Sequence, residues 1–308
     1  MARKTKHQSE ETAYLQKISA QPWPEHDLYQ SLTVEEDQDR TNVHYEQPAE
    51  FFYRITGGEW NTYSCNLWPD DTTTDTQSQE AKLDVLAKQM QLKPGQRVLD
   101  VGCGWAGPLV YLSKTYGVEG VGLTLSPTQK QAADARIAAH GANVQVNLRH
   151  WEEYEDRAGF DAVYTDEVIV HIHHLGEFFK KVRGLLRPGG LMVNKEVHYT
   201  KKEYLQLSRG EVFINEIYGF TGNYRTLHEE LALVDEAGFE LIWHHQIAQA
   251  EYRQTLSRWL SNQHANRERL TELVGKDTYD RFRIYLKLVR AGFNTPVVTI
   301  DVVTARKV

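Results

Sequence analysis

The sequence has few of the residues that several structural classes depend on. Its 308 residues include only two cysteines, Cys65 and Cys103. Two thiols in a chain of this length provide neither a disulfide scaffold nor a metal cluster, and they suit the reducing cytosol. No apolar run approaches the roughly 18 residues needed to cross a bilayer. The first residues contain no apolar signal core. We therefore expect a cytoplasmic protein without integral membrane association.

Basic side chains are also fewer than acidic ones. Lysine and arginine total 35, aspartate and glutamate total 42, and the formal net charge is -7. Proteins that bind nucleic acid non-specifically neutralise phosphates with clustered lysine and arginine, so this balance argues against nucleic acid as a partner. Apolar residues make up 41% of the chain and charged residues 25%, which are ordinary values for a soluble globular enzyme.

A glycine-rich turn between apolar runs is the most informative feature that is present. In order, residues 97–126 contain an apolar run, Asp100, the glycines Gly102, Gly104 and Gly107, a helical stretch at 108–116 and a second apolar run at 118–123. This order predicts a strand, a turn, a helix and a parallel strand, the opening unit of a nucleotide-binding α/β sheet. Glycines there let the backbone approach a ligand closely. The spacing also satisfies the dinucleotide fingerprint, so it leaves the ligand open.

Two acidic positions distinguish the candidate ligands. A dinucleotide site places a carboxylate at the end of the second strand to hold the ribose hydroxyls. Here that strand runs into GLTLS (122–126) without an acid. Asp100 instead lies just before the turn, where it would face the cationic methionine end of S-adenosylmethionine. The pattern therefore favours S-adenosylmethionine over NAD.

The rest of the chain continues in alternating strand and helix patterns. Expected strands are 97–102, 118–123, 144–149, 160–165, 191–197, 239–247 and 297–303, and the last long helices are 251–273 and 278–293. This order predicts an α/β fold with a doubly wound, mostly parallel, seven-stranded Rossmann-like sheet. We divide the chain into an N-terminal arm with helices covering the site (1–75) and a main domain (76–308). The main domain carries a helical cap insertion at about 198–225.

The ordered motifs resemble one enzyme family. They are HYE (44–46), EFF (50–52), TYSC (62–65), QEAK (79–82), LKPG (92–95), VLDVGCGW (98–105), GLTLS (122–126) and HWE (150–152). In this order they are similar to the cyclopropane fatty acid and mycolic acid cyclopropane synthases, which are class I S-adenosylmethionine-dependent methyltransferases. The resemblance runs from His44 to the C-terminus, and it implies S-adenosylmethionine as the cofactor.

The resemblance also implies which residues bind the cofactor. Asp100, Gly102 and Gly104 would face its methionine portion, and Tyr63 and Ser64 would close over that end. Hydroxyl and amide groups would replace the missing carboxylate near the ribose and adenine. The residues implied there are Thr124, Leu125, Gln129, Trp151, which offers a flat face to the purine, and Glu152, which could accept the adenine amino group.

The chain departs from this family at the site of its second reaction step. Cyclopropane synthases hold a bicarbonate ion with a cysteine, a glutamate in a Phe-Glu-His triplet and a histidine on the fifth strand. Here Cys65 is kept, but the triplet is Ile-Val-His (169–171) and the strand position is Lys195. Because two partners of the anion are missing, we expect simple methyl transfer without ring closure.

Two consecutive carboxylates, Asp166 and Glu167, follow the fourth expected strand, where α/β sheets place their chemistry. Relatives that methylate alkaloid amines or geranyl diphosphate carbon resemble this chain in having a glutamate at the position of Glu167. A carboxylate there can take a proton from an amine, or from the cation left by alkene methylation, and stabilise positive charge. We expect Glu167 to be catalytic and Asp166 to be a solvated loop residue or a helix N-cap.

His171 and Tyr63 are the other catalytic candidates. His171 is either a hydrogen-bonding group or proton relay in the substrate site, or a plain loop histidine. If Glu167 is a bystander, His171 or Tyr63 takes its role. His171, His173 and His174 follow at i, i+2 and i+3, which could suggest a metal, but zinc pairs at i, i+3 or i, i+4 usually have a third ligand elsewhere, and we expect no metal.

The acceptor is left open among three hypotheses. The segment 211–220, followed by Tyr224, is apolar and aromatic, which suits a small lipophilic substrate. The first hypothesis is C-methylation of an alkene or electron-rich carbon in an isoprenoid- or lipid-like metabolite. The second is N-methylation of a small amine, and the third is cofactor binding without catalysis. An isoprenoid diphosphate acceptor would need Mg²⁺ and basic groups near the pocket, to which Glu80, Asn42 and Arg225 are possible contributors. A homo-oligomer is also left open.

Overall fold

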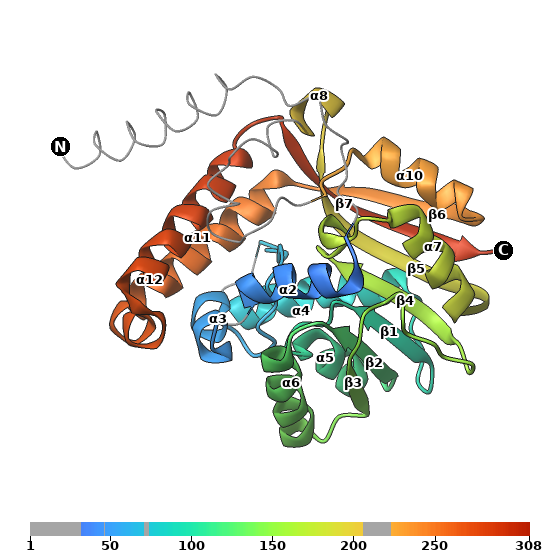
Figure 1. Cartoon of the computed structure of the whole chain (residues 1–308), viewed down its shortest axis with the longest axis horizontal. Helices are drawn as coiled ribbons and strands as arrows, with labels where there is room; N and C mark the ends of the chain where they lie inside the picture. The colour runs from blue at the N-terminus through green and yellow to red at the C-terminus, as the bar shows by residue number, and fades with distance from the viewer. Residues whose placement is uncertain (1–31, 46, 71–73, 206–222) are drawn as a thin grey trace.

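The computed structural model describes residues 32–45, 47–70, 74–205 and 223–308. Within them, one seven-stranded sheet has the order β3-β2-β1-β4-β5-β7-β6 (Figure 1). Neighbouring strands from β3 to β5 are parallel, and β7 is antiparallel to both β5 and β6. The strands are β1 (Arg97–Val101), β2 (Glu119–Thr124), β3 (Val144–Leu148), β4 (Phe160–Asp166), β5 (Leu186–Tyr199), β6 (Phe239–Ile247) and β7 (Val298–Lys307). The expected doubly wound, mostly parallel α/β sheet is confirmed.

Helices cover the sheet and extend beyond one edge of it. The helices near the sheet are α4 (Asp75–Gln89), α5 (Gly107–Tyr116), α6 (Pro127–His140), α7 (Leu175–Leu185) and α10 (Leu227–Glu236). A second group, α3 (Ala49–Thr56), α11 (Gln249–Ala265) and α12 (Arg267–Gly292), packs together at one side of the molecule (Figure 1). The helix α2 (Val34–Tyr45) and two short elements, η1 (Ile169–His171) and α8 (Lys202–Leu205), complete the list.

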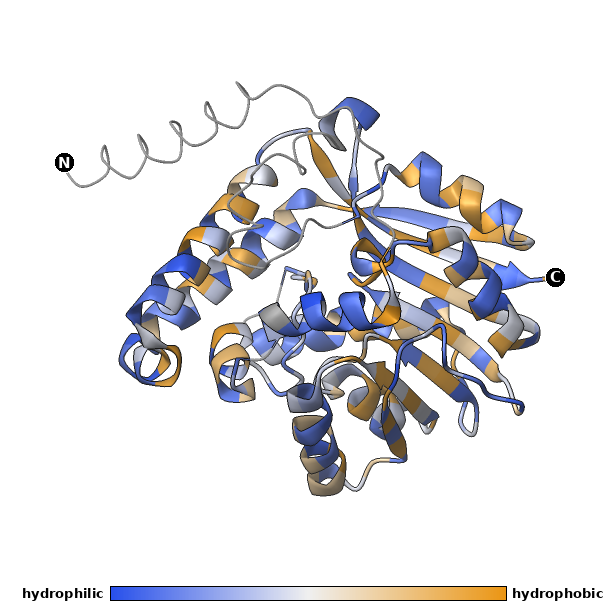
Figure 2. Cartoon of the chain, viewed as in Figure 1, coloured by the Kyte–Doolittle hydropathy of each residue, from blue (hydrophilic) through white to orange (hydrophobic). Residues whose placement is uncertain are grey.

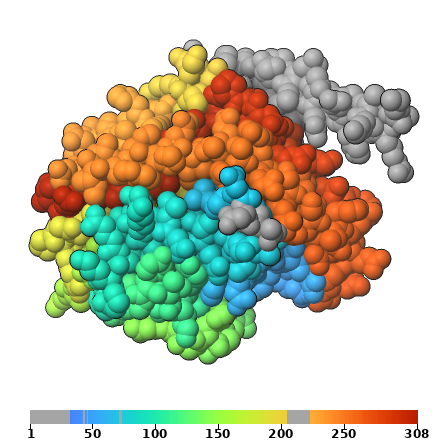
Figure 3. Space-filling view, turned by 180° about the vertical axis from the view of Figure 1, so that it is seen from behind, coloured from blue at the N-terminus to red at the C-terminus, as the bar shows by residue number. Residues whose placement is uncertain are grey.

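Apolar side chains fill both faces of the sheet. One buried cluster joins α3, α4, α5, α11 and α12 to the first face, and another joins α7 and α10 to the second face. Figure 2 shows orange, apolar stretches in the strands that are interrupted by polar ones. Seen from behind, the blue N-terminal residues lie between the green first βα units and the orange C-terminal helices (Figure 3). No helix among the described residues is long and apolar enough to cross a membrane.

Local signals explain several element boundaries. Ser126 accepts a hydrogen bond from the Gln129 amide and caps α6, with Pro127 at the first helical position as expected. Thr226 and Glu229 form a capping box at the start of α10. At Gly107, the start of α5, an added Cβ would lie 1.8 Å from the Trp60 carbonyl oxygen, so only glycine fits this approach.

The C-terminal helices break at different places from those expected. The expected helix 251–273 is wrong, because α11 ends at Ala265 and Asn266, with φ -101° and ψ 19°, separates it from α12. Inside α12, Gly275 has φ 79° and ψ 160°, which is a kink near the expected gap. The fifth strand is longer than expected, because its pairing with β7 continues to Tyr199. The N-terminal arm and the apolar segment 211–220 of the cap lie outside the described residues.

Candidate active site

A cavity of 150 Å³ opens at the carboxyl ends of β1, β2 and β4. It brings together nearly all residues expected to bind the cofactor: Tyr63, Ser64, Asp100, Gly102, Gly104, Thr124, Leu125, Gln129 and Trp151. The catalytic candidates Glu167 and His171 also line it. Glu152 is exposed and is not among the lining residues. We call this space the cofactor cavity.

The glycine turn leaves room for a ligand inside this cavity. Gly102 has φ +81°, and an added Cβ would lie 2.6 Å from Val168 Cγ2. Gly104 has φ +53°, and an added Cβ would meet no atom within 4 Å. Both glycines therefore adopt backbone conformations that other residues rarely take. The space that a side chain at Gly104 would occupy is empty, so a cofactor can approach the backbone there.

Asp100 gives the cavity an acidic group beside this turn. The carboxyl is 3% exposed and accepts a hydrogen bond of 2.6 Å from the Tyr164 hydroxyl. Burial raises the pKa of Asp100 to about 7, although the Tyr164 hydrogen bond opposes the rise. A cationic ligand would stabilise the ionised form and lower this pKa. The acid therefore fits the ammonium and sulfonium charges of S-adenosylmethionine.

The helix α2 closes the cavity from the N-terminal side. Its Asp37 contacts His150 Nε2 at 3.2 Å and His173 Nε2 at 3.3 Å. Burial opposes ionisation, but these two hydrogen bonds hold the pKa of Asp37 well below its usual range. Asp37 and Tyr45 line the cavity. Sequence reasoning missed Asp37, because an acid in the first turn of a helix is ordinary and its two histidines follow more than 100 residues later.

A second cavity of 120 Å³ adjoins the first. Tyr45, Tyr63, Glu167 and His171 line both cavities, so they form the boundary between them. The far wall comes from α11 and α12, and its side chains are mainly aromatic. We call this space the acceptor cavity, because it begins where the cofactor cavity ends.

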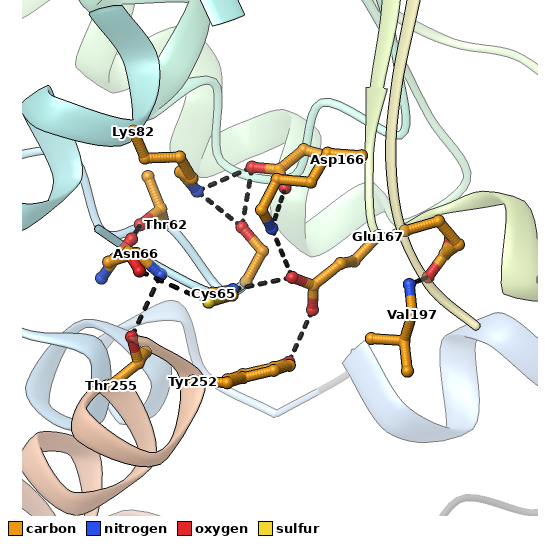
Figure 4. Close-up of polar contacts among 12 residues, drawn as sticks. Thr62, Cys65, Asn66, Lys82, Asp166, Glu167, Val197, Tyr252 and Thr255 are labelled. Carbon is orange, nitrogen blue, oxygen red and sulfur yellow. Dashed lines mark hydrogen bonds and ion pairs between the residues drawn. The ribbon is translucent and has the colours of Figure 1, made fainter. Parts of the chain in front are cut away.

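Glu167 is held at this boundary in an unusual backbone conformation. Its φ is +60°, one of four positive values among the described non-glycine residues. Its Oε1 accepts a hydrogen bond of 2.8 Å from the Cys65 amide and pairs with Lys195 Nζ. Its Oε2 accepts a hydrogen bond of 2.5 Å from the Tyr252 hydroxyl (Figure 4). A positive φ at a non-glycine residue is strained and persists only where the surrounding structure imposes it. Strained residues of this kind cluster at functional sites.

Asp166 lies in a buried ion network, so the expected solvated or capping role is wrong. Lys82 Nζ contacts Asp166 Oδ2 at 2.6 Å, and Lys195 Nζ contacts Asp166 Oδ1 at 2.9 Å (Figure 4). Ser64 Oγ donates a further hydrogen bond of 2.7 Å to Asp166. Burial opposes ionisation, but Lys195 and Lys82 hold the pKa of Asp166 well below its usual range. Two lysines and two acids thus balance in charge beneath the cofactor cavity.

We expect Lys195→Met to lower the free energy of unfolding by about 3–5 kcal/mol, the range for removing one partner of a buried ion pair. The change leaves Glu167 without a cation and Asp166 with Lys82 alone. Urea unfolding would measure the loss. Lys276→Met, which removes an exposed pair with Asp280, is the control and should change stability little. Equal effects of the two substitutions would contradict the prediction.

The two remaining catalytic candidates also lie at the cavity boundary. Burial lowers the pKa of His171 to about 4, so its imidazole is neutral at neutral pH. Tyr63 stacks on Trp259 of α11 with ring centroids 5.2 Å apart. His173 has structural partners instead, since its Nδ1 contacts Asn223 at 2.8 Å and its Nε2 contacts Asp37. The structure therefore brings Glu167, His171 and Tyr63 together.

The residues considered for a diphosphate acceptor are not at either cavity. Arg225 is buried and donates hydrogen bonds to the backbone carbonyls of Ile172 at 3.0 Å and His173 at 2.9 Å. Glu80 accepts a hydrogen bond from Trp60 Nε1 at 3.0 Å. Neither they nor Asn42 are lining residues of the two cavities. The structure therefore does not place any of the three in the lining of the acceptor cavity.

Comparisons with known proteins agree with this geometry. A family model described as "Mycolic acid cyclopropane synthetase" matches residues 33–303. A "Probable fatty acid methyltransferase" of Pseudomonas putida is 28% identical over 255 residues, which are 81% of this chain and 64% of that protein. The "Cyclopropane-fatty-acyl-phospholipid synthase" of Escherichia coli K12 is 30% identical over 218 residues, 70% of this chain and 54% of that protein. The chain thus matches less than two thirds of the length of either relative.

A solved structure extends the comparison to the fold. The mycolic acid cyclopropane synthase CmaA1 "complexed with SAH and CTAB" has a TM-score of 0.80 and 25% identity, covering 88% of this chain and 98% of that chain. Its bound SAH agrees with the cofactor that Asp100 and the glycine turn fit. The chain therefore belongs to the mycolic acid cyclopropane synthetase family of S-adenosylmethionine-dependent methyltransferases.

Proposed function

We propose that this methyltransferase methylates the nitrogen of a small lipophilic amine in the acceptor cavity, with Glu167 taking up the released proton. The observation that carries the proposal is the position of the Glu167 carboxylate, which lines both cavities at their boundary. A methyl group leaving the cofactor cavity for the acceptor cavity would pass this boundary. Its strained backbone indicates that the surroundings hold the side chain there.

The hydrogen bonds of Glu167 leave it able to accept one more. An ionised carboxylate offers about two acceptor positions on each oxygen. Cys65 and Lys195 fill those of Oε1, and Tyr252 fills one on Oε2. Among the described residues, no donor fills the remaining position of Oε2. That position can orient an amine N–H and then receive its proton.

The chemistry requires such a proton acceptor. S-adenosylmethionine supplies a methyl group on a sulfonium sulfur, so its transfer forms an N–C bond, breaks the S–C bond and leaves the nitrogen with a proton to lose. Glu167 receives that proton from a primary or secondary amine. Neutral His171 is close enough to line the same boundary and can pass the proton on. Buried aromatic walls exclude water from the reacting atoms.

The charge of the acceptor cavity supports an amine over an anion. Its described lining includes two carboxyl groups, Glu167 and Glu196, and no lysine or arginine. A diphosphate or free fatty acid headgroup would meet two carboxyl groups there and no lysine or arginine among the described lining residues. An amine would meet acids that favour its protonated product and aromatic faces that attract a cation.

C-methylation of an alkene or electron-rich carbon is the second candidate. The aromatic lining of the acceptor cavity favours it, because such faces stabilise the carbocation that alkene methylation leaves. Glu167 would then take a proton from the adjacent carbon. The names of relatives such as the fatty acid methyltransferase of P. putida also suggest lipid acceptors. Both candidates place the same carboxylate next to the cation.

Incubation of the purified protein with methyl-labelled cofactor and matched panels of hydrophobic amines and neutral alkenes tests the proposal. We expect label in amines, a product mass increased by one methyl group and no cyclopropane ring. Added bicarbonate should leave turnover unchanged, because the Cys65 amide already binds Glu167. Label in alkenes alone would transfer support to C-methylation. Cofactor binding without labelling of either panel would favour a non-catalytic protein.

A further inference from the structure

The acceptor cavity contains a second carboxyl group that the proposed chemistry does not use. Glu196 lies on β5 and is only 2% exposed. Its Oε1 accepts a hydrogen bond of 2.8 Å from the Val197 amide, and its Oε2 accepts one of 3.2 Å from the Val170 amide. Within the described part of the chain, no lysine, arginine or histidine is ion-paired with it. A cationic ligand can therefore form the ion pair that this buried carboxyl lacks.

The charges around Glu196 leave room for one positive charge. Asp166 and Glu167 are matched by Lys82 and Lys195 in the adjacent network. An ionised Glu196 would add a negative charge that this network does not balance. A cation that balances the ionised form would come from outside the described residues, and the acceptor cavity is the space that Glu196 lines.

The other walls of the cavity suit a cation with attached carbon groups. Tyrosine and tryptophan rings approach it from different elements: Tyr45 from α2, Tyr63 and Tyr224 from loops, Tyr252 and Trp259 from α11, and Tyr285 from α12. Aromatic faces attract ammonium groups, and several faces around one site are how quaternary ammonium ligands are recognised. The rings also bury the alkyl substituents of such a cation.

We infer that Glu196 and these rings form a binding site for an organic ammonium group, which is the form of the acceptor before it gives up a proton and becomes a nucleophile, and the form of its methylated product. The inference rests on the proposed function in one respect, namely that this cavity holds the acceptor. Glu196 binds the cation in this assignment, whereas Glu167 takes up the proton. The two carboxyl groups therefore affect different steps, and their variants should differ in KM and kcat.

The binding should depend on pH through Glu196. Burial, and then the charge of Glu167, raise the pKa of Glu196 to about 8, while its backbone hydrogen bonds and His198 oppose the rise. In the empty cavity the group is therefore largely protonated at neutral pH. A bound cation favours the carboxylate, so affinity increases as the pH rises through this value and binding releases a proton.

Several other titratable groups around the cavity have pKa values that are shifted away from that range. Burial lowers the pKa of His171 to about 4 and that of His44 well below its usual value. Hydrogen bonds from the imidazole to the carboxylates of Asp301 and Glu230 outweigh burial and raise the pKa of His198 to about 10. Burial raises the pKa of Tyr45, Tyr224 and Tyr252. Glu167 is paired with Lys195. Burial opposes the charged form of Lys195, but the charges of Asp166 and Glu167 raise its pKa.

Calorimetry with phenyltrimethylammonium tests the site without any methyl transfer, because this cation has no nitrogen lone pair to methylate. We expect the full-length protein to bind it up to about 25-fold more tightly at about pH 8.5 than at about pH 6.5, because a group with a pKa of about 8 is about three-quarters ionised at the first pH and about 3% ionised at the second. Glu196→Gln should weaken binding and remove the pH dependence. Glu240→Gln, an exposed glutamate on β6, is the matched control and should keep both.

The outcomes separate this inference from the proposed function. A pH-independent affinity, or equal affinity of wild type and Glu196→Gln, would overturn the cation site even if amines are methylated. Binding that depends on Glu196, together with no methylation of any amine, would keep the site and overturn N-methylation. Retained thermal unfolding temperature and S-adenosylhomocysteine affinity show that Glu196→Gln is folded. Glu196→Asp, which restores the charge, should recover part of the pH dependence.

Discussion

Glu167→Gln should reduce turnover by about 10²-fold or more, the usual scale for losing a general base. The substitution keeps the shape of the side chain and can still accept the Cys65 amide, but it cannot take up a proton. Lys195 remains paired with Asp166 in this variant, so the buried network keeps a counter-charge. The loss should appear in the rate constant with nearly unchanged cofactor affinity, because the lost interaction belongs to the transition state.

Two further variants distinguish a chemical role of Glu167 from a structural one. The double variant Glu167→Gln/Lys195→Met removes one charge of each sign and should be more stable than Lys195→Met alone. It should remain as inactive as Glu167→Gln. Tyr252→Phe removes one hydrogen bond to Glu167 and should reduce turnover less. If Glu167→Gln instead works at nearly the wild-type rate, His171 or Tyr63 becomes the leading candidate for the base.

Gly104→Val should weaken S-adenosylmethionine and S-adenosylhomocysteine binding by about 10- to 100-fold. The added methyl groups would enter the cofactor cavity at the place where a Cβ meets no protein atom, so a bound ligand must move. Overpacking of this kind costs about 1–3 kcal/mol, and about 1.4 kcal/mol is a factor of ten in affinity. Titration calorimetry would measure both ligands, with NAD as the compound that should not bind.

Gly141→Val is the matched control for this substitution. Gly141 ends α6 with φ +57°, close to the +53° of Gly104, and an added Cβ there also meets nothing within 4 Å. Both variants therefore carry similar backbone strain, but only Gly104 lines the cofactor cavity. Equal loss of affinity in both would mean that strain, rather than occupation of the cavity, causes it. Tight binding of NAD by the wild type would contradict the cofactor assignment.

Much of the fold could be predicted because short-range signals determine it. Apolar runs flanked by glycine or proline predicted several strands closely, and β6 (Phe239–Ile247) agreed at both ends, although β5 and β7 are longer than expected. The break at Asn266 could not be predicted, since residues on both sides favour helices and packing of α11 and α12 on α3 decides where the chain turns. The cofactor residues were predictable for a similar reason, because most are in loops that directly follow strands.

The rest of the site depends on contacts between distant residues. Lys82 occupies a helix that the sequence shows as amphipathic, and its burial follows from Asp166, 84 positions later. Tyr252 donates a hydrogen bond to Glu167, which lies 85 positions earlier, and no sequence pattern around Tyr252 indicated this contact. A signal did exist for Lys195 and Glu196, since two adjacent charges interrupt an otherwise apolar strand. Only the register of β5 against β4, with Asp166 opposite Lys195, reveals what the first of them pairs with.

The two halves of the site come from different parts of the architecture. None of the residues of α11 or α12 lines the cofactor cavity, yet these two helices supply Tyr252, Trp259 and Tyr285 to the acceptor cavity, and Phe293, just after α12, also lines it. Substitutions in these two helices can therefore alter acceptor preference while leaving the cofactor cavity unchanged. New acceptor specificities could therefore be selected from libraries confined to this helical hairpin, with S-adenosylhomocysteine affinity as a check on the unchanged half.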